Sequence, residues 1–261
     1  MTAPALPSPH LERFERDGYT VLEGFFSRDE CDRIVAEIEQ TNFRLDLGAK
    51  DDGQLEYRPM MHLLSPGLQA VACDERWAPV VLPLVGDDAG ARLYWEQAVF
   101  KPPHAHTELP WHQDNGYTPL VPEAYLTCWV AFDDADESNG CIHVIPGSHR
   151  NGTRSHVNDP GGSPFRVGNV ESDEGAVAVP VSAGDVLLFS SLVMHRSGPN
   201  MTDGARRAWI IQYCGADALS ALSGKALDDR LLLAQNGVWL AEPRRDREFD
   251  LVGVLANYDQ G

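Results

Sequence analysis

The chain has few basic residues. Only 21 Lys and Arg stand against 39 Asp and Glu, which gives a formal net charge of −18 over 261 residues. Nucleic-acid-binding proteins and proteins that dock on anionic membranes need a basic face, so this balance argues against both classes. A polyanionic ligand is disfavoured for the same reason, unless a local basic pocket overrides the overall field.

The sequence also lacks the marks of a membrane or secreted protein. No apolar run reaches the roughly 18 residues that a membrane-spanning helix needs, and residues 1–9 have neither a basic region nor an apolar core, so no signal peptide is predicted. The cysteines are odd in number, and none stands in CxxC spacing. We therefore expect reduced thiols in a cytoplasmic protein. They are Cys31, Cys73, Cys128, Cys141 and Cys214.

What is present indicates a single domain over residues 1–261, since a hydrophobic content of 43% suffices for a large core. Helical spacing dominates residues 8–85. Short apolar strands separated by Gly and Pro turns follow from about 92 to 215, and residues 216–261 are expected to be helical or irregular. This order is typical of a mainly β fold, a jelly roll of the cupin-like kind with helical cladding.

Local signals fix some of these elements. Pro9 at the first turn and Gly18 at the end bound a first helix, and Ser27 with Glu30 forms a capping box that begins a second. Residues 218–233 are predicted to be helical, although Gly224 weakens the pattern.

One short motif has the composition of a metal site. On a strand, His112 and Asp114 point to the same side, and His195 ends an apolar run before a Ser-Gly-Pro turn. Two His and one carboxylate on one face leave open positions on a metal, as in non-haem Fe(II) oxygenases. An HxD pair alone is weak evidence, because a hydrogen-bonded surface pair has the same spacing.

Other histidines compete for a metal. His104 and His106 form an HxH pair, but the two prolines before them indicate a turn. His143 alternates with apolar residues, and it can face the interior of the barrel or be an ordinary core histidine. The expected turn places the HxH pair below the HxD motif.

Polar residues near the predicted strands can hold a cosubstrate. Arg206 precedes an apolar strand and offers a bidentate fork for the remote carboxylate of a dicarboxylate. Trp129 can pack against such a molecule, and Gln97 and Ser197 can donate hydrogen bonds to it. The alternative for each of them is core packing or turn capping. That structural explanation is favoured for Ser197 and Lys101, and the functional one for Arg206.

Several longer motifs together resemble the phytanoyl-CoA dioxygenase family. The resemblance spans roughly residues 11–215, and the motifs that carry it are Phe14–Phe25, Trp111–Asp114, Asn139–His149, His195–Asn200 and Arg206. It implies a double-stranded β-helix and an oxygenase that depends on Fe(II), 2-oxoglutarate and O2. In this family the HxD residues and the distal histidine bind iron, here His112, Asp114 and His195. Arg206 then holds 2-oxoglutarate, and Trp129 and Gln97 line its pocket.

The resemblance implies hydroxylation of an unactivated C–H bond with release of succinate and CO2. Related members divert the reaction to epimerisation, cyclisation or desaturation, and the sequence does not choose among these outcomes. Halogenation is disfavoured, because halogenating members lack the carboxylate that Asp114 supplies. Two further alternatives are a cupin-type metal dioxygenase or isomerase without a cosubstrate, and a non-catalytic binding barrel. A carboxylate clamp at Arg206 argues against both.

The substrate is expected to be small and largely neutral, such as an intermediate of secondary metabolism, because an acidic chain is a poor host for acyl-CoA. Tyr57, Met60 and His62 are predicted to contact it. They lie in the aperiodic segment 42–65, which is either a lid or a plain surface loop, and the long loop 150–175 is a second candidate wall. The assembly is expected to be a monomer or a small homo-oligomer.

Overall fold

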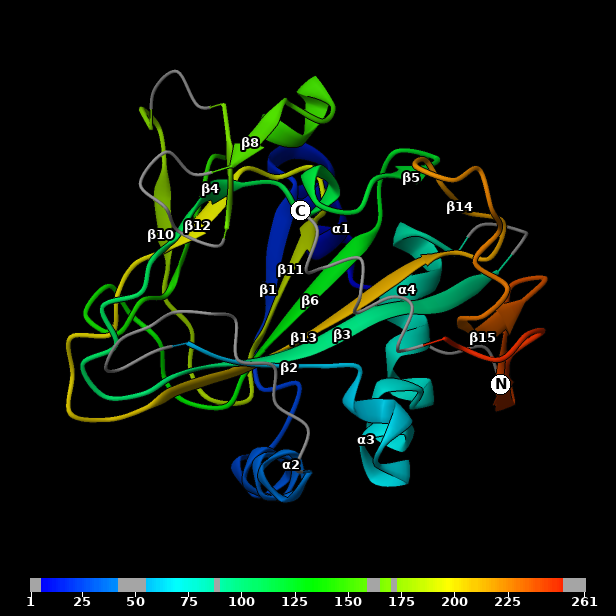
Figure 1. The fold of residues 1–261 in the computed structure, drawn as a ribbon, viewed down its shortest axis with the longest axis horizontal. Coiled ribbons are helices and arrows are strands. Elements are labelled where there is room, and N and C mark those ends of the chain that lie inside the picture. Colours follow the sequence, from blue (N-terminus) through cyan, green and yellow to red (C-terminus); the bar gives the residue numbers. More distant parts are fainter. Residues whose placement is uncertain (1–5, 42–54, 87–89, 159–164, 170–172, 251–261) are drawn as a thin grey trace.

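A computed structural model describes residues 6–41, 55–86, 90–158, 165–169 and 173–250 (Figure 1). Helices gather in the first third of the chain and strands dominate the rest. The α-helices are α1 (Ser8–Asp17), α2 (Arg28–Gln40), α3 (Pro66–Ala72) and α4 (Ala78–Leu84). Short 3-10 helices are η1 (Met61–Leu63), η2 (Glu75–Trp77), η3 (Asp114–Gly116) and η4 (Ser148–Asn151).

Two antiparallel sheets form the jelly roll that the pattern of strands predicts. The large sheet has eight strands in the order β1-β11-β6-β13-β3-β15-β16, with β2 also paired to β3. Its members are β1 (Tyr19–Leu22), β2 (Glu56–Pro59), β3 (Ala91–Lys101), β6 (Leu126–Ala131), β11 (Val186–Ser190), β13 (Arg206–Gly215), β15 (Leu231–Gln235) and β16 (Val238–Arg244).

The smaller sheet has four strands in the order β10-β7-β12-β4. They are β4 (Leu109–His112), β7 (Ile142–Val144), β10 (Val177–Val179) and β12 (His195–Ser197). Two short ribbons complete the fold, β5 (Leu120–Val121) with β14 (Leu219–Ser220), and β8 (His156–Asn158) with β9 (Arg166–Gly168).

Capping residues set the helix boundaries as expected. Gly18 adopts a left-handed conformation with φ 83° and ends α1, and its N–H donates to the carbonyl of Phe14 at 2.8 Å. Ser27 and Glu30 form the predicted capping box at the start of α2. Helix α1 begins at Ser8, one residue before the expected position, with Pro7 as the preceding residue.

Alternation along the strands divides the apolar residues between two cores. On β13, Trp209 and Ile211 face the layer of helices, whereas Ala208 and Ile210 face the smaller sheet. Trp77 is fully buried beneath the helices and packs against Tyr213, with ring centroids 5.7 Å apart. Helices α2 to α4 therefore cover one face of the large sheet (Figure 1), and the inner face is left for the site between the sheets.

The C-terminal part differs from expectation. Residues 218–233 are not helical: β14 and β15 lie there, and β15 pairs with the edge of β3 and with β16. Gly224 has φ 66° within the connection, which interrupts any helix. Burial of the run from Leu231 to Ala234 at this sheet edge outweighs its helical propensity.

The two candidate walls of the substrate pocket also differ from expectation. Residues 150–175 are not a single loop, because β8 and β9 form a hairpin within them. Of the segment 42–65, residues 42–54 lie outside the described residues. The described remainder is ordered structure: β2 pairs with β3, and η1 is packed into the core.

The cysteines fit the expectation of reduced thiols. All five are free, and all five are buried. Burial raises the pKa of the Cys31 thiol to about 11, so this side chain behaves as a core residue rather than as a reactive thiolate. No helix in the described part of the chain combines the length and hydrophobicity needed to cross a membrane.

Candidate metal centre

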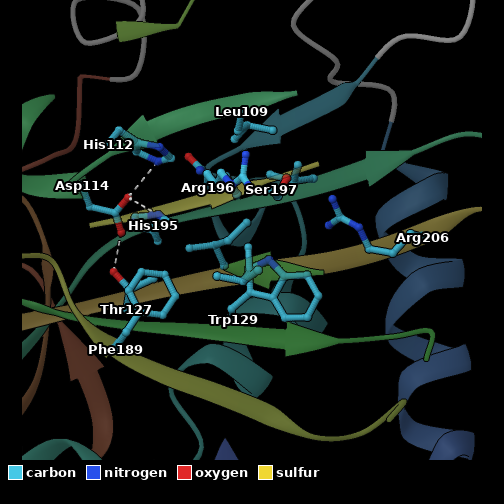
Figure 2. Close-up of a pocket in the computed structure, with 14 residues that line it drawn as sticks. Leu109, His112, Asp114, Thr127, Trp129, Phe189, His195, Arg196, Ser197 and Arg206 are labelled. Carbon is cyan, nitrogen blue, oxygen red and sulfur yellow. Dashed lines mark hydrogen bonds and ion pairs between the residues drawn. The ribbon is translucent and has the colours of Figure 1, made fainter. Parts of the chain in front are cut away.

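The three residues of the predicted metal site converge in the structure. His112 ends β4, Asp114 begins η3, and His195 begins β12 opposite His112 in the sheet register. Asp114 Oδ1 lies 3.7 Å from His112 Nε2 and 3.5 Å from His195 Nε2, and one donor atom of each residue lies within 4.8 Å of the others (Figure 2). Two imidazoles and one carboxylate in this arrangement suit Fe(II) and leave positions for other ligands.

Backbone carbonyls fix the tautomers of both histidines. His112 Nδ1 lies 2.7 Å from the carbonyl of Pro110, and His195 Nδ1 lies 3.0 Å from the carbonyl of Val193. A carbonyl only accepts, so each Nδ1 carries the hydrogen and each Nε2 presents its lone pair to the metal position. The pKa of His112 lies well below its usual value of 6.5, mainly because the ring is buried and secondly because His195 is close to it. This imidazole therefore stays neutral and able to bind a metal.

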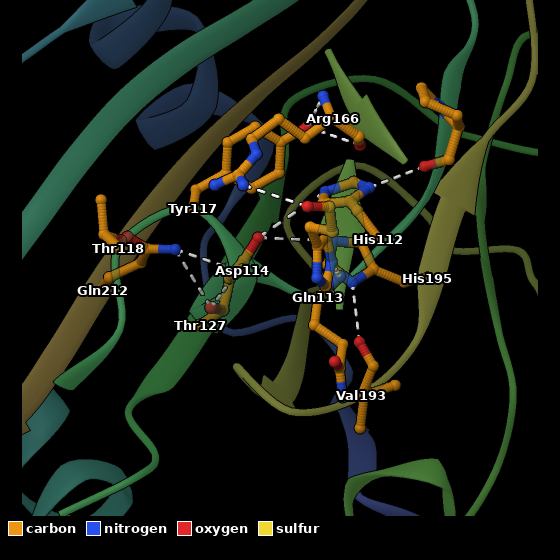
Figure 3. A network of polar contacts seen from close by, with 12 residues as sticks. His112, Gln113, Asp114, Tyr117, Thr118, Thr127, Arg166, Val193, His195 and Gln212 are labelled. Atoms are coloured by element: carbon orange, nitrogen blue, oxygen red, sulfur yellow. Dashed lines mark hydrogen bonds and ion pairs between the residues drawn. The ribbon is translucent and has the colours of Figure 1, made fainter. Parts of the chain in front are cut away.

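The carboxylate of Asp114 is held by two residues that sequence reasoning missed. Its Oδ2 accepts from the hydroxyl of Thr127 at 2.6 Å and from Nε2 of Gln212 at 3.0 Å (Figure 3). Both residues alternate onto the inner face of the large sheet, and this periodicity was the only signal in the sequence that pointed to them.

A cavity leads from this cluster to Arg206 at its other end (Figure 2). Arg206 is fully buried, and its Nε and Nη1 have no hydrogen-bond partner. Its guanidinium lies 5.4 Å from the ring centroid of Trp129, and burial lowers its pKa to about 10. A buried guanidinium with two unpaired nitrogens fits a carboxylate ligand. Arg207 points to the other face and pairs with Asp133 at 2.8 Å.

Gln97 lines the same cavity and has a defined orientation. Its Oε1 accepts from Trp95 Nε1 at 2.9 Å and from the hydroxyl of Tyr57. An indole N–H can only donate, so the atom of Gln97 that meets it must be the carbonyl oxygen. The amide nitrogen is therefore the group that Gln97 can offer to a ligand. Tyr57 was predicted to contact the substrate. In the structure its hydroxyl instead helps to hold the carbonyl oxygen of Gln97 in place.

Lys101 and Ser197 lie close to Arg206 but differ in their surroundings. Lys101 is fully buried, and its Nζ donates to the carbonyls of Thr107 at 3.1 Å, of Ser197 at 3.4 Å and of Gly198. These contacts fasten the chain after β12 and fit the structural role favoured for Lys101. Ser197 lines the cavity, and its buried hydroxyl has no partner, so it is free to bind a ligand.

Met60 and His62 are buried away from the lining of this cavity. His62 Nδ1 lies 3.1 Å from the carboxylate of Glu96, which also accepts from Trp209 Nε1 at 2.6 Å. The structure therefore gives His62 a place in a buried polar network, and substrate contact by Met60 and His62 remains a prediction without structural support.

The remaining histidines do not form a second cluster among the residues described. His104 pairs with Asp203 at the surface at 3.0 Å, and His143 lies 3.5 Å from the exposed Glu137. In the described part of the chain, the His-Asp-His cluster is the one group of three His, Cys, Asp or Glu residues with converging donor atoms.

The β8–β9 hairpin is fastened beside the metal cluster. Gln113, between the two HxD residues, donates its N–H to His156 Nε2 at 2.8 Å. The hydroxyl of Tyr117 donates to the carbonyl of Arg166 at 3.0 Å and accepts from its N–H at 2.8 Å (Figure 3). The Tyr117 ring lies edge-on to the His112 ring, with centroids 5.5 Å apart. Part of the predicted 150–175 wall therefore does border the site.

Comparison with known proteins gives consistent relatives. The family model "Phytanoyl-CoA dioxygenase (PhyH)" matches residues 14–208. A probable alpha-ketoglutarate-dependent hypophosphite dioxygenase of Stutzerimonas stutzeri is 28% identical, over 77% of this chain and 76% of the relative. An ectoine dioxygenase of Bordetella parapertussis is also 28% identical, over 81% and 76%.

Among solved structures, the fold is similar to that of the epimerase SnoN in complex with Fe3+, alpha ketoglutarate and nogalamycin RO. The TM-score is 0.71 at 25% identity, and the alignment covers 92% of this chain and 94% of SnoN. The carbocyclase SnoK from nogalamycin biosynthesis has the same fold, with a TM-score of 0.67 at 24% identity over 84% of this chain and 89% of SnoK.

Proposed function

The chain belongs to the phytanoyl-CoA dioxygenase family and is an Fe(II)- and 2-oxoglutarate-dependent dioxygenase, and from this premise we propose which residues carry the activity. His112, Asp114 and His195 bind the iron, and Arg206 binds the remote carboxylate of 2-oxoglutarate. The observation that carries the proposal is a single cavity with three converging metal-ligand atoms at one end and, at the other, a buried guanidinium with two unpaired nitrogens.

When bound, iron with 2-oxoglutarate and O2 supplies the oxidising power, and the overall hydroxylation converts R–H, O2 and 2-oxoglutarate to R–OH, succinate and CO2. The residues of the chain hold the geometry. Arg206 is itself buried and neutralises the remote carboxylate. Trp129 packs against the aliphatic part of the cosubstrate, and Gln97 and Ser197 donate hydrogen bonds to its oxygens. The apolar lining from Ile142 and Phe189 excludes water.

We further propose a small, largely neutral organic substrate, an intermediate of secondary metabolism, that is hydroxylated at an unactivated C–H bond. The net charge of −18 supports a substrate with little negative charge, and the likeness to SnoN supports an organic natural product. The same likeness favours epimerisation as the second candidate outcome, because SnoN is an epimerase.

One experiment tests both parts. Purified protein is loaded with Fe(II) anaerobically, mixed with 2-oxoglutarate and O2, and assayed for succinate without and with candidate substrates. We expect slow succinate formation alone and faster, coupled formation with a substrate. Mass spectrometry with labelled O2 then separates the outcomes, since hydroxylation adds one labelled oxygen to the product and epimerisation adds none. No succinate from iron-loaded protein would contradict the proposed function.

A further inference from the structure

We propose that Thr127 and Gln212 are positioning residues that hold Asp114 as a one-oxygen ligand of the metal. This inference rests on the proposed function, because it concerns the same carboxylate. The two side chains bind one oxygen of Asp114 and leave the other to the metal position, so they decide how many coordination positions remain open.

The two oxygens of Asp114 make different contacts. Oδ1 faces both imidazole Nε2 atoms, at 3.7 and 3.5 Å. Oδ2 turns away from them and accepts from Thr127 at 2.6 Å and from Gln212 at 3.0 Å. Gln212 Nε2 also lies 3.3 Å from the hydroxyl of Thr127, so the three groups form a closed triangle (Figure 3).

The donors in this triangle are fixed by chemistry. An ionised carboxylate only accepts, so the hydroxyl of Thr127 must donate to it, and the atom of Gln212 that meets it must be the amide nitrogen. Hydrogen bonds to a charged acceptor are stronger than neutral ones. Thr127 is fully buried and Gln212 is 6% exposed, so water has little access to either donor.

Two strands of the large sheet form the platform for this contact. Thr127 on β6 and Gln212 on β13 are direct cross-strand partners, and both point from the inner face toward the start of η3 (Figure 3). Asp114 itself lies just beyond β4, outside regular strand pairing. The rigid sheet therefore supplies the orientation that the short 3-10 helix does not.

This orientation matters for the number of open positions. Two imidazoles and one carboxylate oxygen leave three positions of an octahedral ion for 2-oxoglutarate and O2. A carboxylate free to rotate can bind through both oxygens and occupy one of them. Residues that orient a ligand typically change metal affinity or activity about 10- to 100-fold when removed, and we expect an effect of this size on the binding of metal and of 2-oxoglutarate.

The test replaces each donor in the full-length protein. Thr127→Val removes the hydroxyl at nearly constant shape, and Gln212→Met keeps the length of the chain without a donor. Thr20→Val is the matched control, because Thr20 is 1% exposed and bonds His10 at 3.1 Å, on a strand that contributes no metal ligand. Anaerobic titrations measure the Kd of Fe(II), and then of 2-oxoglutarate on the metal-loaded protein. The visible spectrum of bound Co(II) reports the coordination number.

We expect Thr127→Val and Gln212→Met each to weaken Fe(II) or 2-oxoglutarate binding about 10- to 100-fold and to change the Co(II) spectrum. Thr127→Ser, which restores the hydroxyl, should recover both, and Thr20→Val should match the wild type. Wild-type affinities and Co(II) spectra in both variants would overturn the inference while leaving the iron site in place. If Thr127→Val fails to fold, Gln212→Met tests the inference by itself. A wild-type protein that binds no Fe(II) would instead overturn the proposed function.

Discussion

Nε2 of His195 lies 3.5 Å from Oδ1 of Asp114, although the two residues begin different elements in distant parts of the sequence. Their approach depends on the pairing of β12 with β4, which sets His195 opposite His112. The register of β12, which also pairs with β7, thus sets the metal cluster, and a slip of one residue would turn His195 to the other face.

The first prediction concerns the metal ligands. His112→Ala, Asp114→Ala and His195→Ala should each abolish iron binding and activity, because each variant removes one of the three side chains that converge on the metal position. The fold should persist, since the large sheet and its helical core contain none of the three. Elemental analysis measures the iron, and circular dichroism checks the fold. Full activity in any one variant would remove that residue from the site.

The second prediction separates Arg206 from its neighbour. Arg206→Ala should raise the Kd of 2-oxoglutarate at least about 30-fold, since breaking a buried charged contact costs about 2 kcal/mol or more, while Fe(II) affinity changes little. Arg207→Ala is the matched control, because it removes a partly exposed ion pair with Asp133 on the other face. Calorimetric titration of the metal-loaded protein measures both. The opposite ranking would show that Arg207 holds the cosubstrate.

The third prediction concerns the orientation of Gln97. Tyr57→Phe removes the hydroxyl that helps to hold its carbonyl oxygen, and a neutral hydrogen bond contributes about 1 kcal/mol. We expect KM for 2-oxoglutarate to rise about 5-fold with unchanged iron affinity and substrate preference. A change in substrate preference with unchanged KM for 2-oxoglutarate would instead support the sequence-based expectation that Tyr57 contacts the substrate.

The fourth prediction concerns pH. Burial lowers the pKa of His156 from its usual value of 6.5. Just below pH 6.5, the unfolded chain therefore binds more protons than the folded chain. Stability must therefore fall as pH drops through about 6.5. We expect the Tm of the metal-free protein to be lower at about pH 5.5 than at about pH 7.5, and His156→Gln to reduce this difference. An equal or larger drop in His156→Gln would assign the effect to other groups.

Local signals in the sequence determined much of the architecture. Gly18, Ser27 and Glu30 act within one turn of chain, and the alternation on strands such as β13 needs only the neighbouring residues. The HxD pair belongs to this class too, because residues two apart on an extended chain share a side. Such features depend on short-range geometry, so they could be predicted from the sequence.

Other features depended on partners far away in the chain. The end of the segment expected as a helix over 218–233 became strand β15 where β3 offered a free edge, because sheet pairing and burial outweigh a weak helical preference. His62 turned out to bind the buried carboxylate of Glu96 rather than to line the cavity, since nothing in a local pattern reveals on which side of a sheet an irregular segment packs.

The sequence by itself determined the chemistry of this protein: the types of metal ligand, the arginine for a carboxylate and the family motifs that join them. Only the tertiary structure decided how those groups are held. Thr127 and Gln212 look like ordinary strand residues until β6 and β13 pair and set them against one oxygen of Asp114. The physical reason is that ligand identity is a property of single side chains, whereas orientation arises from contacts between strands that are distant along the chain.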